Sequence, residues 1–531
     1  MRVLAVLLFL IPGLLLAQQN SFLLTQNEKF YVDAYTASTD SFFHTTFKPL
    51  VKSTISGYSE IDKRIFRDGS DSIFIAKKKH TWFWKKLLTE DLIEVEQGKF
   101  HLSINPVLNF EYGKDSTNRF AVNSRGLIIL GDLSDKFSFT TGVLETQAFP
   151  EKYISNYLTA KSVVPGQGRI RIFKKTGYDY SYSFGNISYS PSKHFNFQLG
   201  HGKQFVGDGY RSLLLSDVPF YYPYFRTTTT FKRIQYVNLW TAFQEVRPYD
   251  NRTLVYQRKH GSFTFLNFLI SKKTQIGLFE AVIFQTTDSA TNNKVPVDIL
   301  NPVIGYRTLQ YGLRYKHNTL VGITAKVDIE EQLSLYGQFV LDDIKRNNEP
   351  GNFHNRFGYQ AGLKMLEPFN IHNLFLLTEY NTVRPFTYSA TSEHQNYSAY
   401  NEPLAHPLGA NFKELIFLCK YNFKDAFIQL KFVSAFFGNE SIPGQVVPYD
   451  TTGHNIFQSY SGTISENSFK TGNGISTNVK NLNIECGITI NQKNRLQLVA
   501  GAHYRTYSNT PNTSYYYVAL KTSISNLYYD F

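Results

Sequence analysis

The chain of 531 residues is 16% aromatic, with 36 Tyr and 45 Phe, and it carries a formal net charge of +13. Its two Cys argue against a disulfide framework, and Cys419 and Cys486 are best interpreted as small apolar residues within strands. Lys and Arg stand singly along alternating segments, which argues against nucleic acid as a partner. We expect these cations to face a watery lumen, lipopolysaccharide phosphates or an acidic glycan.

Residues 1–17 have the three parts of a secretory signal peptide. Arg2 precedes an apolar run over residues 3–16, and the small Ala17 precedes two glutamines. The run is too short for a spanning helix, so we expect cleavage after Ala17 and export from the cytoplasm. No Cys follows Ala17 directly, so a lipoprotein anchor is not expected.

Residues 18–98 are predicted to form a periplasmic segment with helices. In residues 80–95 (HTWFWKKLLTEDLIEV), apolar side chains recur at helical spacing, namely Trp84, Leu87, Leu88, Leu92 and Val95. Lysines cluster around Trp82 and Trp84, at Lys77, Lys78, Lys79, Lys85 and Lys86. Two interpretations remain open: an amphipathic helix on the inner membrane face or over a barrel mouth, or an ordinary packed helix with a solvated basic side.

From residue 99 to residue 531 the dominant pattern is alternation with a period of two, which predicts strands. One face of residues 482–490 carries Leu482, Ile484, Cys486, Ile488 and Ile490, and a polar turn at 491–494 leads to a second alternating segment. Repeated hairpins of this kind are typical of a barrel with lipid outside and water or a plug inside. The sequence therefore predicts an all-β, transmembrane outer-membrane β-barrel of about 18 antiparallel strands. A soluble secreted β-protein is the alternative.

The candidate strands lie at residues 100–112, 119–131, 136–147, 177–189, 194–203, 235–245, 261–270, 275–285, 319–329, 332–342, 356–366, 373–383, 411–423 and 426–437, before three strands at the C-terminal end. One or two further strands are expected near 221–230 and 306–317, which gives about 16 to 18 in all, and the preference of bacterial barrels for even numbers favours 18. Short turns at 190–193, 271–274 and 423–426 should be periplasmic, and long polar stretches near 148–176, 286–305, 384–410 and 438–478 should be extracellular. Between about 204 and 320 the alternation of upward and downward strands fails, which indicates an irregular segment.

The segment 197–226 is the candidate binding loop. Gly200, Gly202, Gly207 and Gly209 permit a tight fold-back, and residues 213–215 are consecutive leucines that should pack within the loop. Planar rings alternate here with groups that form paired hydrogen bonds, a mixture suited to sugar rings with hydroxyls or carboxylates. The candidate polysaccharide-binding residues are Asp208, Tyr210, Arg211, Asp217, Tyr221, Tyr222, Tyr224 and Arg226. The other interpretation is a structural plug that constricts the lumen, and both roles could hold together.

No catalytic pattern stands out. Asp208 and Asp217 form only an arbitrary carboxylate pair, and His201 near Ser212 or Ser216 lacks the surrounding elbow motif of a nucleophile. The thirteen His show no spacing of metal ligands. We therefore expect no enzymatic activity, no cofactor and no metal site.

The last segment, residues 515–531 (YYYVALKTSISNLYYDF), reads as one long strand that ends on Phe531. Leu527, Tyr529 and Phe531 would share its lipid-facing side, and the strand would pair with the first strand to close the barrel. A terminal strand of this kind is typical of outer-membrane barrels.

Several motifs together resemble the gliding motility protein RemB group, which is similar in turn to the capsule-assembly Wzi family. They are residues 197–226 (FQLGHGKQFVGDGYRSLLLSDVPFYYPYFR), 124–126 (SRG), 184–189 (FGNISY), 379–380 (EY) with 384–388 (RPFTY), and 405–411 (AHPLGAN). The resemblance implies an 18-stranded barrel in the cell outer membrane with a helical periplasmic part. It also implies a role in surface polysaccharide (capsule or exopolysaccharide) handling or gliding motility, with polysaccharide and other surface or motility proteins as partners. A porin or substrate-specific channel is the alternative function.

Overall fold

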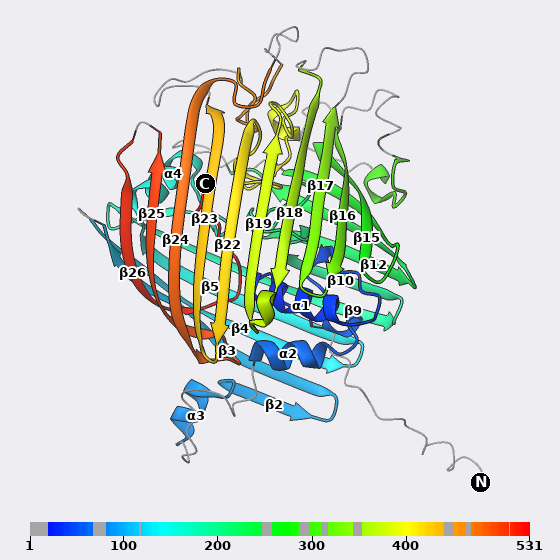
Figure 1. Ribbon diagram of the computed structural model, residues 1–531, viewed down its shortest axis with the longest axis vertical. Coiled ribbons are helices and arrows are strands. Elements are labelled where there is room, and N and C mark those ends of the chain that lie inside the picture. Colours follow the sequence, from blue (N-terminus) through cyan, green and yellow to red (C-terminus); the bar gives the residue numbers. More distant parts are fainter. Residues whose placement is uncertain are drawn as a thin grey trace.

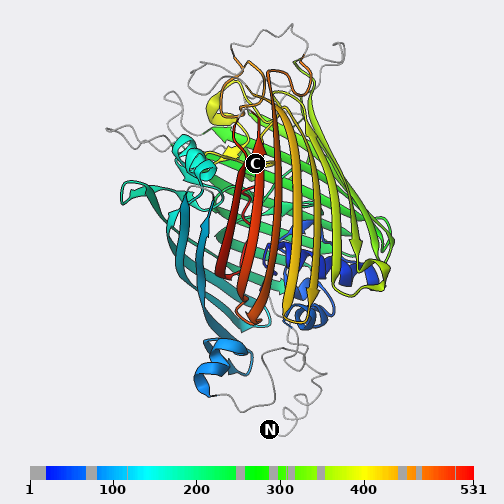
Figure 2. The ribbon, with the colours of Figure 1, turned by 60° about the vertical axis from the view of Figure 1, so that its left-hand side comes forward.

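The computed structural model describes residues 20–66, 81–115, 118–246, 258–285, 297–306, 308, 317–343, 353–439, 451–461, 469–508 and 510–531. These residues form a closed antiparallel barrel of 18 strands, shown in Figures 1 and 2. Each strand pairs with the next one along the chain, and β26 pairs with β3 from Tyr516↔Lys114 to Lys521↔Asn109 to close the wall. The predicted fold class and strand number are confirmed.

The wall strands are β3 (Phe100–Lys114), β4 (Arg119–Ser134), β5 (Phe137–Phe149), β9 (Gly177–Ser192), β10 (Phe195–Gly202), β12 (Tyr222–Phe231), β13 (Ile234–Gln244), β14 (Arg258–Leu269), β15 (Thr274–Gln285), β16 (Asn318–Glu330), β17 (Leu333–Asp343), β18 (Arg356–Leu366), β19 (Leu374–Val383), β22 (Phe412–Phe423), β23 (Ala426–Asn439), β24 (Ile475–Asn491), β25 (Leu496–Tyr507) and β26 (Thr513–Thr522). The strand expected near 221–230 is β12, and most of the candidate at 306–317 lies outside the described residues.

The other described elements are α1 (Gln26–Ser38), β1 (Phe47–Lys48), η1 (Lys52–Thr54), α2 (Tyr58–Phe66), α3 (Trp82–Leu88), β2 (Ile93–Gln97), α4 (Lys152–Lys161), β6 (Val163–Val164), β7 (Gly168–Arg169), β8 (Arg171–Phe173), β11 (Phe205–Val206), η3 (Val297–Leu300), η4 (Pro368–Asn370), η5 (Glu393–Gln395), β20 (Ser398–Ala399) and β21 (Glu402–Pro403). No helix among the described residues is long and apolar enough to cross a membrane.

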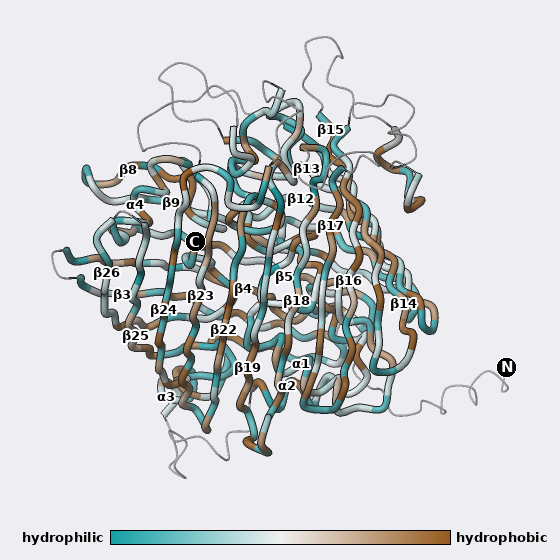
Figure 3. The backbone as a smooth tube through the Cα atoms, turned by 45° about the horizontal axis from the view of Figure 1, so that its top comes forward, coloured by the Kyte–Doolittle hydropathy of each residue, from teal (hydrophilic) through white to brown (hydrophobic). Residues whose placement is uncertain are grey.

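The wall separates an apolar outer surface from an interior in which buried polar and charged side chains stand beside apolar clusters, and alternation along the strands places the two faces. Ile484 and Leu498 point outward from neighbouring strands and are 40% and 48% exposed, whereas Asn481 points inward and is buried. Cys419 and Cys486 lie on outward positions as free thiols. Figure 3 shows the hydrophobic and hydrophilic residues succeeding one another along the strands.

The two ends of the barrel differ. The predicted turns at 190–193, 271–274 and 423–426 lie at one end, here called the short-turn end, and the long connections lie at the other, the long-loop end (Figure 1). Which end faces the periplasm stays a prediction. Stretch 148–176 contains α4 and three short strands, whereas stretch 384–410 packs down into the barrel with Tyr388 and Tyr397 fully buried. The stretches 286–305 and 438–478 are described only in part.

The prediction for the C-terminal end is confirmed where β26 pairs with the first strand to close the barrel, and it was wrong for residues 523–531. β26 ends at Thr522, and residues 523–531 leave the wall and run inside the lumen, so Leu527, Tyr529 and Phe531 form no lipid-facing strand. The barrel closes without residues 523–531, and polar groups of this tail form ion pairs and hydrogen bonds inside the lumen. Asp530, 3% exposed, lies 2.9 Å from a nitrogen of Arg211 and 2.9 Å from Lys431 Nζ.

The N-terminal segment lies partly inside the barrel. α1 begins where the Thr25 hydroxyl accepts a hydrogen bond from the Glu28 amide at 3.2 Å. The helix packs against inward side chains of the wall: Phe30 stacks on Phe375 of β19 with ring centroids 5.0 Å apart, and Asp33 pairs with Lys364 of β18 at 2.5 Å. The assignment of residues 18–98 to the periplasm stays a prediction.

The helix expected over 80–95 is shorter than predicted. α3 ends at Leu88, and Val95 belongs to β2, which pairs with β3 at the short-turn end (Figure 1). Val95 satisfies helical spacing, but its apolar side chain also suits a strand beside the free edge of β3, and Leu92 lies just before that strand. The signal peptide and Lys77, Lys78 and Lys79 lie outside the described residues.

Candidate binding site in the barrel lumen

The lumen is occupied by chain segments from distant parts of the sequence. The plug consists of the N-terminal segment 20–66 and the central loop 203–221, joined by the β1–β11 pairing of Phe47↔Val206 and Lys48↔Phe205. The tail, residues 523–531, passes beside them toward α4, where the Phe531 ring lies 4.7 Å from that of Tyr157. The irregular segment predicted from the sequence therefore folds inward rather than over the outside.

Arg211 of the central loop is the centre of a buried charge network. Its side chain is 1% exposed, and its guanidinium nitrogen lies 3.0 Å from Glu414 of β22 and 2.9 Å from Asp530 of the tail. Lys431 of β23 completes the network through Asp530. Wall, loop and tail are thus held together by charges that cannot be separated without a large desolvation cost.

The backbone of the loop is anchored to the wall as well. Glu379 of β19 accepts hydrogen bonds from the amides of Tyr210 and Arg211, at 2.7 and 3.0 Å. A Cβ added at Gly209 would lie 2.1 Å from a carboxylate oxygen of Glu379, so only glycine permits this approach. Tyr336 donates a further hydrogen bond to Glu379 at 2.8 Å.

The consecutive leucines pack as predicted. Leu213, Leu214 and Leu215 are at most 1% exposed and join an apolar cluster with inward phenylalanines of β14 and β15. Tyr388 and Tyr397 of the 384–410 stretch donate hydrogen bonds to the carbonyls of Leu213 and Leu214, at 2.7 and 2.6 Å. The loop is therefore covered from the long-loop end.

The other predicted polar binding residues are engaged internally too. Asp208 lies 3.4 Å from Lys48 Nζ in the N-terminal segment. Asp217 accepts a hydrogen bond from the Tyr528 hydroxyl at 2.7 Å. Arg226, on β12, donates to the Gln204 side chain at 2.9 Å.

The predicted tyrosines complete this packing. Tyr222 and Tyr224 are each 3% exposed, and Tyr221, half-buried, stacks on Tyr182 with centroids 5.2 Å apart. The structure thus brings the eight predicted residues together as parts of a packed interior. Their contact with polysaccharide stays a prediction.

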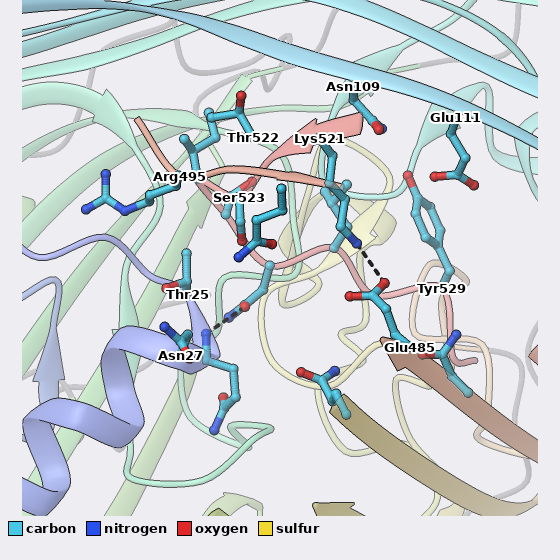
Figure 4. A pocket seen from close by; sticks show the side chains of 18 of the residues that line it. Thr25, Asn27, Asn109, Glu111, Glu485, Arg495, Lys521, Thr522, Ser523 and Tyr529 are labelled. Carbon is cyan, nitrogen blue, oxygen red and sulfur yellow. Dashed lines mark hydrogen bonds and ion pairs between the residues drawn. The ribbon is translucent and has the colours of Figure 1, made fainter. Parts of the chain in front are cut away.

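A cavity of about 410 Å³ remains between the tail, the N-terminal segment and the inner wall formed by β3–β5, β9 and β22–β26 (Figure 4). It reaches from Lys424 and Gln492 in turns of the short-turn end to Ile154 and Leu158 of α4. Of the predicted binding residues, only Tyr210 lines it. This cavity is the candidate site.

Tyrosine dominates the aromatic lining of the cavity. The lining tyrosines are Tyr31, Tyr153, Tyr180, Tyr182, Tyr210, Tyr515, Tyr517 and Tyr529. They come from distant segments, which is why reasoning from local motifs missed all of them except Tyr210. The signal was present in runs such as YDYSYSF at 178–184, because alternate tyrosines of a strand project to the same side.

Charged groups stand among these rings. Lys521 of β26 pairs with Glu485 of β24 at 2.7 Å, and Tyr517 donates to the same carboxylate at 2.8 Å (Figure 4). Arg495 lies 2.7 Å from Glu28 at the N-terminal side of the cavity. Carboxylates, ammonium groups and phenolic hydroxyls of this kind can exchange hydrogen bonds with sugar hydroxyls, while the ring faces offer apolar contact.

Groups at the α4 end add hydrogen-bond donors. The hydroxyls of Tyr153 and Tyr529 are protonated at neutral pH, and burial raises the pKa of both still further. Tyr153 donates to the Tyr529 carbonyl at 3.0 Å. Burial also raises the pKa of Glu151, which lines the cavity, to about 7. The charge at this end of the cavity therefore changes near neutrality.

One group of possible metal ligands occurs among the described residues. Glu94, Glu96 and His101 have ligand atoms within 4.8 Å of one another on the β2–β3 hairpin. They lie outside the cavity, and both glutamates are exposed. Cross-strand pairing of Glu96 with His101 brings them together, which spacing along the sequence does not reveal.

No family model matches the chain, and no curated protein matches it. Among solved structures, it is similar to Wzi of Escherichia coli, described as an outer-membrane protein involved in group 1 capsule assembly and a carbohydrate-binding β-barrel. The TM-score is 0.55 at 11% identity, over 95% of this chain and 100% of that one.

OprD of Pseudomonas aeruginosa matches with a TM-score of 0.41 at 8% identity, over 79% of this chain and 94% of that one. OpdK of the same organism, solved with vanillate, matches with a TM-score of 0.43 at 8% identity, over 79% of this chain and 98% of that one. These identities show the fold alone. The fold expected from the Wzi likeness is confirmed, whereas the comparisons do not support assignment to the RemB group.

Proposed function

We propose that this chain is an outer-membrane β-barrel that binds a surface polysaccharide in its lumen and carries out no chemical step. The observation that carries the proposal is the cavity, in which tyrosine faces and paired charges line an elongated space inside a plugged barrel. Carbohydrate sites combine apolar ring contacts with several directed hydrogen bonds, and this lining supplies both. The description of Wzi as a carbohydrate-binding barrel supports the same reading.

The outer membrane is the proposed location because the outward face is apolar around a closed wall. The surrounding lipid and lipopolysaccharide are then its constant partners. A role in gliding motility is also proposed, and it is supported by the family resemblance alone.

A substrate-specific channel is the second candidate. The cavity extends from the short-turn end toward the long-loop end, as a permeation path would. The two candidates differ in transport across the membrane. A binding barrel retains its sugar in the lumen, whereas a channel releases the sugar on the other side of the membrane.

The test compares inward and outward tyrosines of one strand. Tyr517→Ala removes a ring that lines the cavity, whereas the matched variant Tyr516→Ala removes a neighbouring ring that is 63% exposed on the outer face. We expect Tyr517→Ala to weaken equilibrium binding of polysaccharide isolated from the same cells by roughly tenfold, about 1.4 kcal/mol, and Tyr516→Ala to leave it unchanged. Equal affinities in folded wild type and Tyr517→Ala would contradict binding in the cavity.

A further inference from the structure

Residues 82–97, which contain helix α3 and strand β2 and are here called the α3–β2 hairpin, continue the barrel wall where β26 and β3 close it. β26 ends at Thr522, whose hydroxyl accepts a hydrogen bond from the Leu108 amide of β3 at 3.2 Å. β3 extends further toward the short-turn end, and β2 occupies its free edge there, from Ile93↔Ile104 to Gln97↔Phe100. β2 therefore lies in the surface of the wall, directly below β26.

The register gives β2 the same two faces as the wall. Val95 stands opposite Leu102 and Ile93 opposite Ile104, all on the outward side, and Val95 and Ile93 are 40% and 48% exposed. Glu96 stands opposite His101 on the inward side. The apolar outer surface of the barrel thus runs without a break into this hairpin.

α3 adds a cluster of large aromatic rings to that surface. Trp82, Phe83 and Trp84 are 69%, 59% and 49% exposed. The helix is fixed in place, because the side chain of Asn491, the last residue of β24, donates hydrogen bonds to the carbonyls of Lys86 and Glu90, at 3.1 and 3.0 Å. Three neighbouring exposed aromatic side chains beside an apolar wall suit an environment that is apolar on one side and hydrated on the other, as a membrane–water interface is.

We infer that the α3–β2 hairpin, residues 82–97, docks into the headgroup layer of a phospholipid bilayer at the short-turn end. Trp82 and Trp84 lie at the boundary of the acyl chains, where amphipathic rings are favoured. The exposed ammonium group of Lys85 lies beside anionic headgroups. The inference rests on the continuity of the hairpin with the lipid-facing wall and on its exposed aromatic rings. It requires the proposed outer-membrane location but is independent of the proposed polysaccharide binding.

Tryptophan fluorescence tests the inference directly. Trp82 and Trp84 share the chain with a single further tryptophan, Trp240, which lies on an outward position of β13 and would itself report lipid. Trp240→Phe leaves the hairpin as the sole reporter, and Trp240→Tyr serves if the first variant does not fold. The full-length barrel is reconstituted in vesicles of phosphatidylcholine and phosphatidylglycerol that carry bromine at defined acyl depths.

We expect bromines near the headgroup to quench the fluorescence of Trp82 and Trp84 strongly and bromines at the ends of the acyl chains to quench it weakly. Acrylamide in the aqueous phase should quench this fluorescence several-fold less than it quenches free tryptophan. Lys85→Glu should reduce the lipid quenching in these anionic vesicles, whereas Lys174→Glu, an exposed lysine after β8 at the long-loop end, should not. Full quenching by acrylamide without lipid quenching would overturn the inference. Shielding that grows with protein concentration would overturn it in favour of a second copy or a protein partner.

Discussion

Single residues hold the lumen together through buried charges that are paired across segments. Arg211 joins the central loop to Glu414 of the wall and to Asp530 of the tail. Burial acts to raise the pKa of Asp530, but the guanidinium of Arg211 and the ammonium of Lys431 hold it well below its usual range. The carboxylate therefore stays charged inside the barrel and keeps the tail in place.

Arg211→Ala should destabilise the protein more than any surface substitution. It leaves Glu414 and Asp530 buried without their shared cation, at a cost of roughly 3 to 5 kcal/mol. Arg211→Lys should lose less, because an ammonium group keeps the charge but not the fork geometry. The free energy of unfolding in detergent measures both, with Arg171→Ala, an exposed arginine of β8, as control. A loss no larger than that of the control would contradict the network.

Asp33 makes the free energy of unfolding depend on pH in the acidic range. Burial is the largest single influence and acts to raise its pKa, but Lys364, Lys326 and Lys48 together outweigh burial, so the pKa falls from 3.8 to about 2. Because the folded value is the lower one, the stabilisation is complete above about pH 4 and is lost as the pH falls toward 2. It amounts to about 2 kcal/mol.

The variant Asp33→Asn isolates this contribution. The difference in unfolding free energy between wild type and variant should be constant from pH 7 to about pH 4 and shrink as the pH falls toward 2. Thermal unfolding of detergent-solubilised protein over that range measures it. A difference that does not change below pH 4 would show that the Asp33 pairs are not formed.

At the scale of elements, alternation predicted the strands well and failed where an element leaves the wall. The hairpin of β24 and β25 follows directly from Leu482, Ile484 and Leu498, because lipid on one side and polar groups on the other require period two. The tail keeps the same alternation after Thr522, yet its partner Arg211 is 319 residues away. Local sequence contains no sign of such a contact.

Removing the tail tests whether it belongs to the wall. Because β26 and β3 already pair from Tyr516 to Lys521, deletion of residues 523–531 should still give an assembled, heat-modifiable and protease-resistant barrel of lower thermal stability. Tyr516→Asp with Val518→Asp, on the lipid-facing side of β26, should instead impair assembly, since a charge there costs up to about 2 to 4 kcal/mol. If the protein that lacks residues 523–531 fails to assemble, this result would contradict the conclusion that the wall closes without the tail.

At the scale of the whole molecule, the chain builds a barrel and fills it with its own N-terminal segment, central loop and tail. Composition and alternation sufficed to predict the barrel with about 16 to 18 strands, and the preference for even strand numbers selected the observed 18. The glycines and leucines of the central loop predicted an irregular, inward-packing segment. The candidate cavity could not be predicted, since its lining runs from Thr25 to Asp530 and depends on the closure of the wall.

The filled lumen predicts a low conductance. An 18-stranded wall is wide enough for an aqueous pore only when it is emptied. The intact protein in planar bilayers should therefore conduct little, and deletion of residues 204–220, which contribute Leu213–Leu215 and Arg211 to the filling, should raise the conductance several-fold. A large conductance of the intact protein would favour the substrate-specific channel.

The most direct test of polysaccharide binding in the lumen is the position of a bound sugar. Crystals of the barrel grown with oligosaccharides from the surface polysaccharide of the same cells would show it by diffraction. Polysaccharide binding in the lumen predicts sugar rings in the cavity, against Tyr180 and Tyr517 and within hydrogen-bond distance of Glu485 or Lys521. Sugar bound only on the outer loops at the long-loop end, with the cavity holding water alone, would contradict it.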